Sequence, residues 1–254
     1  MAQPDAIVVG AGPNGLSAAI VLARAGLQVV VYEAQAAIGG GCRSEALTLP
    51  GFVHDVCSAV HPMGIASLFF RSLPLAEHGL TWIQPPSMFA HPLDGDTPAA
   101  LVNRSVADTA RDLDGDADGY RRLVGSAASA WHLLEDVVLS PPHVPRHPVA
   151  AARFGLRALQ PAVRLAQHYL STDRARALFA GVAAHGMVPL ETAPSGAIGL
   201  VLGALAHAVG WPIPRGGAQR LADALASYLR LLGGRIVTDA PVASLDELPP
   251  SKAV

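Results

Sequence analysis

Three glycines near the N-terminus, Gly10, Gly12 and Gly15, have the spacing Gly-x-Gly-x-x-Gly. This spacing is typical of a loop that binds the pyrophosphate of a dinucleotide. The first glycine allows a tight turn, the second lets the backbone approach the phosphates, and the third lets a helix pack closely on a strand. We expect Pro13 and Asn14 to belong to the same cofactor-binding loop, since the N–H groups at the start of a helix attract phosphate.

A carboxylate follows at the expected distance. Glu33 ends an apolar run about 20 residues after the loop, where it can accept hydrogen bonds from both ribose hydroxyls of an adenosine. Ala34 beside it is a further candidate cofactor-binding residue. A 2′-phosphate would meet a like charge at Glu33, so the sequence disfavours NADP and leaves NAD and FAD open.

A second glycine loop separates NAD from FAD. Gly39, Gly40 and Gly41 are consecutive, and Arg43 follows them closely. Glycines let backbone pack under an extended pyrophosphate, and an arginine can neutralise it. A single NAD half-site needs no second loop of this kind, so Gly40, Gly41 and Arg43 favour FAD.

The elements around these residues predict an α/β fold. A strand over Ala6–Val9, a helix ending at Gly26 and a strand over Gln28–Tyr32 form one βαβ unit with a parallel sheet. A helical block over Ala218–Gly234 and a strand over Arg235–Asp239 resume this alternation of helices and strands near the C-terminus. We therefore predict a Rossmann-like FAD-binding domain over 1–62 and 212–254.

The intervening region, 63–211, is predicted to be a mainly helical substrate domain. A short strand is expected over Leu80–Gln84, and Ser140–Pro148 contains four prolines and is read as a linker. The clearest helical blocks are Tyr120–Leu139, Val149–Leu170 with a break at Pro161, Asp173–His185 and Ser195–Val209.

Composition excludes several classes of protein. The 254 residues carry 18 Lys and Arg against 20 Asp and Glu, so the net charge of −2 argues against a nucleic-acid partner. With 51% hydrophobic and 15% charged residues, disorder is excluded. The two cysteines exclude a disulfide scaffold and fit a reducing, cytoplasmic location.

Two apolar stretches have some of the character of membrane segments. The stretch Ala6–Ala25 lacks the positive flank of a signal peptide, and Ser195–Gly210 is too short to span and is expected to be a buried helix. The low charge still leaves peripheral membrane contact open.

Longer segments resemble one family. IVVGAGPNGLSAAIVLARAG, VYEA, GGGCRSEALTLPGFVHDVCSAVHP and WPIPRGGAQRLADALASYLRLLGGRIVTDAPV resemble the phytoene desaturase-like flavoproteins of the amine oxidase and FAD-dependent oxidoreductase superfamily. The resemblance is closest to the branch related to pyridine nucleotide-disulphide oxidoreductase domain-containing protein 2. It implies bound FAD, hydride transfer from a lipophilic small-molecule substrate to flavin N5, and a backbone contact from Val242 to the adenine.

The resemblance also implies that the chain corresponds to the N-terminal half of its relatives. We therefore expect a C-terminally truncated sheet, which leaves self-association or a partner chain open. Two alternatives to an active flavoenzyme stay open: a non-catalytic fragment or half of a split enzyme, and an NAD-dependent dehydrogenase.

No catalytic residue is identified from the sequence. His54, Asp55 and His61 follow the second glycine loop, where they could face substrate or simply pack. No metal site is expected: prolines around His143 and His147 prevent the helix that would align them, and the acidic run that starts at Asp114 lacks the final glutamate of a calcium loop.

Overall fold

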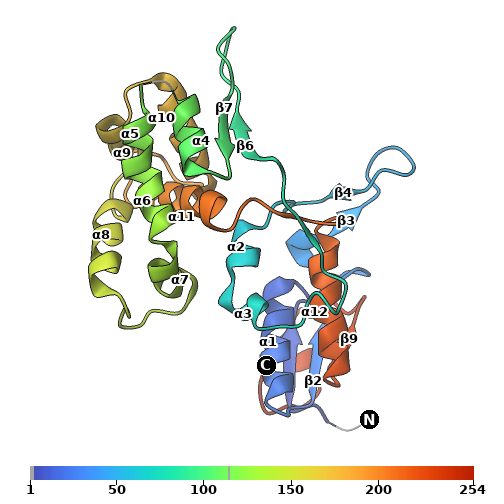
Figure 1. Ribbon diagram of the computed structural model, residues 1–254. Coiled ribbons are helices and arrows are strands. Elements are labelled where there is room, and N and C mark those ends of the chain that lie inside the picture. Colours follow the sequence, from blue (N-terminus) through green and yellow to red (C-terminus); the bar gives the residue numbers. More distant parts are fainter. Residues whose placement is uncertain (1–2, 114) are drawn as a thin grey trace. The chain divides into compact units, whose positions relative to one another are not determined.

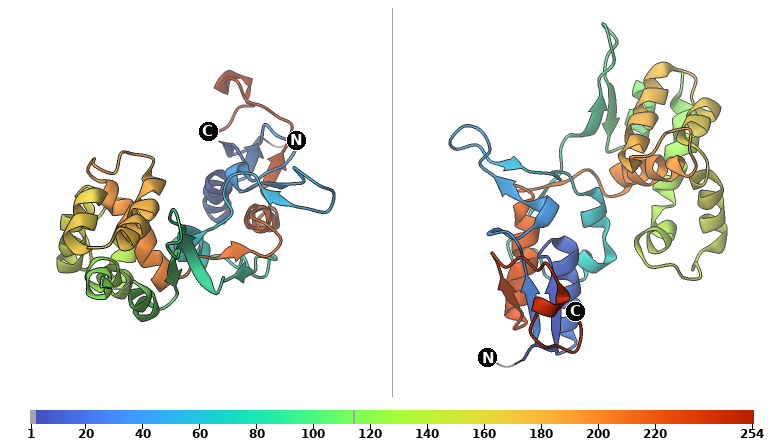
Figure 2. Two further views of the ribbon diagram at one scale, coloured as in Figure 1. Left: turned by 90° about the horizontal axis from the view of Figure 1, so that it is seen from above. Right: turned by 180° about the vertical axis from the view of Figure 1, so that it is seen from behind.

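A computed structural model describes residues 3–113 and 115–254. The chain forms two compact units. The first comprises Met1–His61, Ser72–Ile83 and Ile213–Val254, and the second comprises Pro62–Arg71 and Gln84–Pro212. Figures 1 and 2 show that the first unit brings blue N-terminal segments together with red C-terminal segments, whereas green to orange helices build the second.

The first unit contains the predicted Rossmann-like sheet. Strands β1 (Ala6–Val9), β2 (Val29–Tyr32) and β9 (Arg235–Val237) are parallel and lie in the order β1–β2–β9. Ala6 pairs with Val29, and Val31 pairs with Ile236. Ala253 forms an isolated parallel bridge with Ala6, so residues at the end of the chain add to the sheet beside β1.

Two helices pack together against this sheet. Helix α1 (Pro13–Arg24) connects β1 to β2, and α12 (Gln219–Leu231) precedes β9 and packs against α1. Leu16 and Ile20 of α1 and Leu221 and Leu225 of α12 are fully or almost fully buried. Each helix therefore covers the sheet with an apolar stripe, as the sequence pattern of both segments predicts.

Short elements complete the first unit. These are the 3-10 turns η1 (Gly40–Cys42) and η4 (Leu245–Glu247), and the strand pairs β3 (Ser44–Glu45) with β4 (His54–Asp55), and β5 (Trp82–Ile83) with β8 (Ile213–Pro214).

The predicted domain boundaries differ from the two units at Pro62 and Pro212, which lie in the second unit, and at one longer segment. Residues 72–83, predicted to belong to the helical domain, lie in the first unit. The reason is a long-range pairing: Trp82 and Ile83 form antiparallel pairs with Pro214 and Ile213. The predicted strand over Leu80–Gln84 is present but shorter, as β5.

The second unit is mainly helical, as predicted. It begins with α2 (Pro62–Ala66), α3 (Leu68–Arg71) and the antiparallel hairpin β6 (Ser87–His91) and β7 (Ala100–Asn103). Its later elements are α4 (Val106–Asp112), α5 (Ala117–Tyr120), the π-turn η2 (Arg121–Gly125), α6 (Ser126–Ser129), α7 (Trp131–Leu139), α8 (Pro148–Ala158), α9 (Ala162–Tyr169), α10 (Asp173–Ala183), η3 (Ala184–Gly186) and α11 (Ser195–Ala208).

Several predicted boundaries are confirmed. The chain breaks at Pro161 between α8 and α9, and the proline-rich segment connects α7 to α8, with Pro148 at the first position of α8. The block predicted as one helix over Tyr120–Leu139 is divided at Ala130, whose backbone leaves the helical conformation (φ −90°, ψ 3°).

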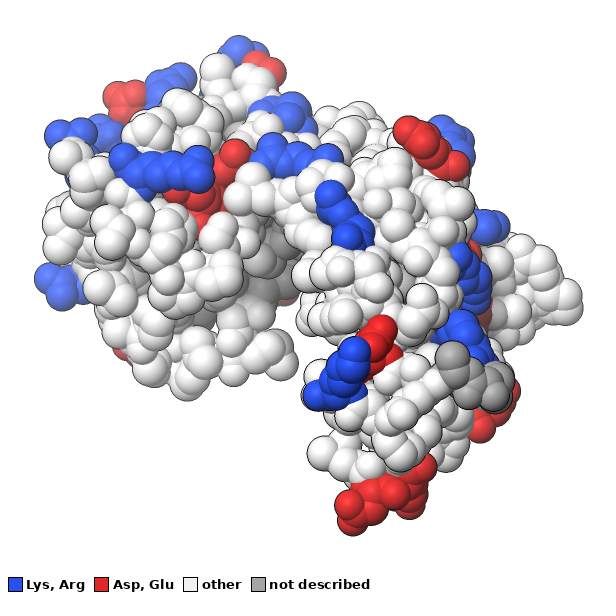
Figure 3. Space-filling view, turned by 90° about the horizontal axis from the view of Figure 1, so that it is seen from below, with Lys and Arg blue, Asp and Glu red and all other residues white. Residues whose placement is uncertain are grey.

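Helix α11 is the buried helix expected from the apolar stretch. It runs for 14 residues, and Leu200, Ala204 and Leu205 are almost completely buried in the core of the second unit. Within the residues that the structure describes, no helix combines the length and the apolar character needed to cross a bilayer. Figure 3 shows wide surface areas without charged side chains, in keeping with the low charged content.

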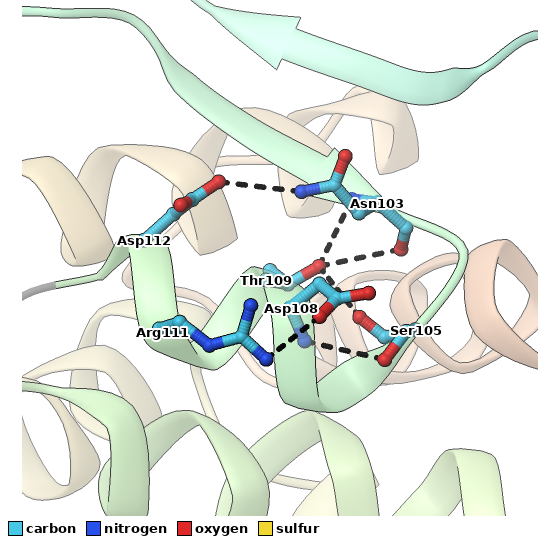
Figure 4. A network of polar contacts seen from close by, with 6 residues as sticks. All are labelled: Asn103, Ser105, Asp108, Thr109, Arg111 and Asp112. Carbon is cyan, nitrogen blue, oxygen red and sulfur yellow. Dashed lines mark hydrogen bonds and ion pairs between the residues drawn. The ribbon is translucent and has the colours of Figure 1, made fainter.

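A polar network fixes the turn between β7 and α4 (Figure 4). Ser105 caps α4 by accepting a hydrogen bond from the N–H of Asp108 at 3.2 Å. The Thr109 hydroxyl accepts a hydrogen bond from the N–H of Asn103 at 2.9 Å. The same hydroxyl lies within donating distance of the carbonyls of Asn103 and Ser105, with oxygen–oxygen distances of 3.3 and 3.2 Å. The side-chain amide of Asn103 donates to Asp112 at 3.3 Å. The bond to Ser105 satisfies an N–H group that the start of the helix leaves without a partner, and the others tie the end of β7 to α4.

Part of the acidic run beyond α4 has a structural role. Asp114 lies outside the described residues. Asp116 occupies the N-cap position of α5, but its side chain makes no capping bond. It accepts instead from the N–H of Ser171 at 2.7 Å, and from the N–H and hydroxyl of Thr172 at 2.8 and 2.6 Å. The carboxylate therefore ties the start of α5 to the segment between α9 and α10.

Candidate dinucleotide-binding site

The first glycine loop connects β1 to α1 in the conformation that its spacing predicts. Gly10 has φ of +97°, a region that side chains disfavour, and its N–H donates to the carbonyl of Tyr32 at 2.7 Å. A methyl group on Gly15 would overlap the carbonyl oxygen of Gly10. Gly12 caps α1, and Pro13 occupies its first position, so the unpaired N–H groups of the first turn face the loop.

Glu33 joins the end of β2 to this loop. Its side chain is only 8% exposed, and one oxygen accepts from the N–H of Ala11 at 2.7 Å. The other oxygen accepts from the N–H of Gln35 at 3.0 Å. A carboxylate offers about four acceptor positions, so two remain for hydroxyl donors. Ala34, the neighbouring candidate, is exposed.

The second glycine loop lies directly against the first. The N–H of Gly39 donates to the carbonyl of Ala11 at 2.9 Å. A methyl group on Gly40 would come within 3.3 Å of the Gly12 Cα, and one on Gly12 within 3.9 Å of the Gly40 Cα. The structure therefore brings together two loops that are separate in the sequence, and both present bare backbone to each other.

Arg43 stands at the end of the second loop. Its side chain is 25% exposed and its Nε lies 3.7 Å from a carboxylate oxygen of Glu45. That Nε is buried and has no hydrogen-bond partner in the described part of the chain. A buried donor without a partner is costly, and an anion bound at the loop would supply the missing acceptor.

The start of α12 holds the second loop in place. Asp55 accepts from the N–H of Ala218 at 2.7 Å and from the Ser44 hydroxyl at 2.6 Å. The same hydroxyl accepts from the N–H of Gln219 at 3.0 Å. The Gln219 side chain donates to the carbonyl of Ile38, next to the second loop, at 3.1 Å. The sequence does not decide whether Asp55 faces substrate or packs. These bonds give it a positioning role.

Sequence reasoning missed Ser44 and Gln219 as partners in this arrangement. One signal could have found them. Gly217 has φ of +97°, and a methyl group there would come within 2.6 Å of the Ser44 hydroxyl. The glycine pair before α12 thus marks a close approach to another part of the chain, in this case to the strand β3.

Comparison with known proteins gives this site a context. Residues 8–71 match the family described as NAD(P)-binding Rossmann-like domain. The chain is 32% identical over 267 residues to a hydroxyneurosporene desaturase of Cereibacter sphaeroides, a match that covers 95% of this chain and 50% of the relative. It is also 32% identical over 190 residues to the hydroxyneurosporene desaturase of Rhodobacter capsulatus, covering 70% of this chain and 38% of that one.

A solved structure of putrescine oxidase shares the fold. The TM-score is 0.58 at 22% identity, and the alignment covers 94% of this chain and 51% of the oxidase. The chain is thus similar to two desaturases and shares its fold with an amine oxidase, as the resemblance of its sequence motifs predicts. It spans about half the length of the curated relatives that it matches. The region matched by the dinucleotide-binding family, residues 8–71, contains both glycine loops and Glu33.

The residues of the site fit the ADP part of FAD. Gly12 and Gly40 leave a cradle without side chains, which suits a pyrophosphate. Arg43 offers a buried donor without a partner, and Glu33 offers acceptor positions for ribose hydroxyls. Two of the three parts of an ADP group, the pyrophosphate and the ribose, therefore meet the chemistry that they require.

Val242, the residue expected near the adenine, lies in a segment beside Glu33. The N–H of Glu33 donates to Val237 at 2.8 Å, and the N–H of Ala240 donates to Glu33 at 2.9 Å. Val242 follows two positions later and is half-buried. Its contact with the adenine stays a prediction. The assignment to the branch related to pyridine nucleotide-disulphide oxidoreductase domain-containing protein 2 also stays a prediction.

The two histidines near the second loop differ in their contacts. His54 shares a hydrogen bond with Thr48 at 2.6 Å. His61 is only 9% exposed, and its ring centroid lies 6.1 Å from that of Trp82. Burial lowers the pKa of His61. Among the described residues, no group of three or more His, Cys, Asp or Glu side chains could hold a metal ion.

Proposed function

We propose that this chain binds FAD and provides the flavin-binding part of an oxidoreductase of the dehydrogenase or desaturase type. The observation that carries the proposal is the contact between the two glycine loops beside Glu33. A dinucleotide half-site for NAD needs only the first loop and the acid. The second loop, with the half-buried Arg43, supports an extended cofactor whose pyrophosphate lies between both loops.

Each residue has a definite task in this proposal. The backbone at Gly10, Gly12, Pro13, Asn14 and Gly15 borders the pyrophosphate at the start of α1, where N–H groups and the helix dipole favour negative charge. Glu33, with Ala34 beside it, receives the ribose.

The second loop completes the cradle. Gly40 and Gly41 approach the pyrophosphate from the opposite side, and Arg43 neutralises its charge. Val242 would border the adenine. These residues bind and orient the cofactor, and none of them is proposed to exchange a proton with substrate.

FAD supplies the chemistry of the reaction when it is bound, by accepting a hydride from a substrate C–H bond. The protein then has to bind the substrate, orient it and keep water away. We propose a lipophilic substrate and place its binding in the second unit. The low charged content and the large apolar core of that unit support this, and the desaturases matched here carry the name of a lipophilic compound.

A second candidate is that this chain holds FAD without catalysis of its own, or acts together with a partner chain. The FAD site proposed above is the same in both cases, so only turnover distinguishes them.

The experiment is to express the 254 residues and record the visible spectrum of the purified protein. A yellow preparation with flavin bands, which bleach on addition of a lipophilic substrate, supports the oxidoreductase. Flavin bands without bleaching by any substrate favour the non-catalytic alternative. A folded, colourless protein that binds NAD but does not take up added FAD contradicts the proposal.

A further inference from the structure

The second unit contains a large open groove between α7 and α8. Its volume is about 860 Å³, within the range of roughly 300–1,000 Å³ that small-molecule sites occupy. Leu123, Leu134 and Leu200 form its buried floor. All residues that line it belong to the second unit, so it is separate from the dinucleotide-binding site.

The walls of the groove expose apolar side chains. Val149 and Leu156 of α8 line it and are 64% and 72% exposed. Leu133 and Phe154 line it as well and are half-buried. Apolar surface of this kind is covered in most proteins by a ligand or partner, so the groove has the character of a site for a hydrocarbon chain.

Arginines give the groove a positive charge. Arg153 and Arg157 lie one turn apart on the same face of α8, Arg146 lies just before this helix, and all three line the groove. Its lining contains no aspartate or glutamate. The sequence carries no acidic residue between Asp136 and Asp173, a stretch that contains four arginines.

These arginines differ in how they are paired. Arg157 donates to the carbonyl of Arg122 at 2.9 Å and to the Ser126 hydroxyl at 2.8 Å, so it is held in place. Arg146 has its nearest carboxylate, that of Asp136, at 3.9 Å and is largely exposed. Arg153 is exposed and has no hydrogen bond or ion pair with any residue that the structure describes. Arg153 is therefore available to an anion.

We propose that this groove binds a single-chain anionic lipid, a long-chain carboxylate, with its hydrocarbon chain on the leucine floor and its carboxylate at Arg153 and Arg146. The apolar floor selects the chain, and the arginines select the charge. The guanidinium group of arginine can donate two parallel hydrogen bonds to a carboxylate. Arginine therefore binds a carboxylate more specifically than lysine does. The proposal is independent of FAD, because no lining residue belongs to the first unit.

The test is a binding titration of the full chain with the fluorescent fatty acid cis-parinarate below its micelle concentration, followed by displacement with oleate. We expect saturable binding that oleate displaces and that oleyl alcohol, which lacks the charge, displaces much more weakly. Arg153→Gln should weaken binding about tenfold, because one charge-assisted contact is lost. Arg164→Gln, at an exposed arginine of α9 outside the groove, should leave binding unchanged.

A second pair of variants tests the apolar part. Ala150→Trp places a large ring in the groove and should abolish binding, whereas Ala152→Trp, on the same helix but outside the groove, should not. Circular dichroism verifies that both variants fold. The proposal is overturned if the folded chain does not bind parinarate, or if the variants of each pair behave alike. It is also overturned if only phosphatidylserine vesicles bind, since that result would assign the face to a membrane.

Discussion

One carboxylate oxygen of Glu33 accepts a hydrogen bond from the backbone N–H of Ala11 across 2.7 Å. The bond joins the end of β2 to the first glycine loop, and the carbonyl of the same Ala11 accepts from Gly39 of the second loop. The ribose acceptor and the two phosphate loops are thus connected through one residue. A change at Glu33 should therefore disturb cofactor binding in more than one way.

Replacing Glu33 by glutamine tests that relationship. The amide retains one acceptor oxygen, so either Ala11 or Gln35 loses its partner, at a cost of about 1–3 kcal/mol for a buried N–H. We expect FAD affinity to fall at least about tenfold in a fluorescence titration. Glu77→Gln, at an exposed acid of the same unit, is the control and should bind FAD normally. Equal affinity in both variants would contradict the assigned role.

Gly15→Ala tests the close approach of α1 to the first loop. The added methyl group would overlap the carbonyl oxygen of Gly10, so the loop must move. We expect loss of FAD binding and a lower melting temperature by circular dichroism. The control is Gly155→Ala in α8, where a methyl group meets no atom within 4 Å. That variant should keep FAD and gain roughly 0.5–1 kcal/mol from better helix propensity.

Asp55→Ala tests the link between the second loop and α12. It removes the acceptor for the N–H of Ala218 and for the Ser44 hydroxyl, and a donor left without its partner costs about 1–3 kcal/mol. Urea unfolding should show this loss. Asp55→Asn keeps one acceptor oxygen and should cost less. If Asp55→Ala unfolds at the wild-type urea concentration, the positioning role of Asp55 is wrong.

Tyr120 and His207 form a buried pair whose proton positions follow from the geometry. Nδ1 of His207 lies 3.1 Å from the carbonyl of Arg104, which can only accept, so Nδ1 carries the hydrogen. Nε2 then accepts from the Tyr120 hydroxyl at 2.7 Å. Tyr120→Phe should leave Nε2 without a partner and cost about 1–3 kcal/mol in urea unfolding. Tyr228→Phe, at a half-buried tyrosine, is the matched control and should cost little.

The stability of the fold should fall on mild acidification. Burial lowers the pKa of His61, His91 and His207 in the folded chain, while the unfolded value is near 6.5. The unfolded chain then binds more protons, so stability declines as pH falls from about 6.5 towards the lower folded values. Exposed His143 acts in the opposite direction on the pH dependence of stability, because its hydrogen bond to the carbonyl of Pro141 raises its pKa.

Urea unfolding of wild type and His207→Gln at several pH values between about 7.5 and 5.5 measures this slope. The variant should show a weaker dependence on pH than the wild type. A stability that does not change across this range, or that rises on acidification, would contradict the buried neutral state of these histidines.

Local patterns predicted the parts of the site that are local in the sequence. The glycine spacing and the apolar runs were enough to predict the β1–α1–β2 unit and the place of Glu33, because turn and helix preferences act over a few residues. The second loop could be assigned a role only through its composition. Its contact with Gly12 depends on the packing of α12, which a short-range pattern does not contain.

Long-range contacts account for what sequence reasoning missed. Asp55 and Ala218 lie 163 positions apart, and the hydrogen bond between them is determined by the fold as a whole. The same holds for residues 72–83, which join the first unit through the pairing of β5 with β8. Neither the residues around Asp55 nor those of segment 72–83 contain a local sequence pattern that predicts which distant residues they contact.

The most direct test of the account is a binding isotherm of FAD with the folded, flavin-free chain, measured beside NAD and NADP under the same conditions. The account predicts that FAD binds at one site with the highest affinity, that NAD binds more weakly, and that NADP does not bind, because its 2′-phosphate would lie against Glu33. Tighter binding of NAD or NADP than of FAD, or no FAD binding by a chain shown to be folded, would contradict it.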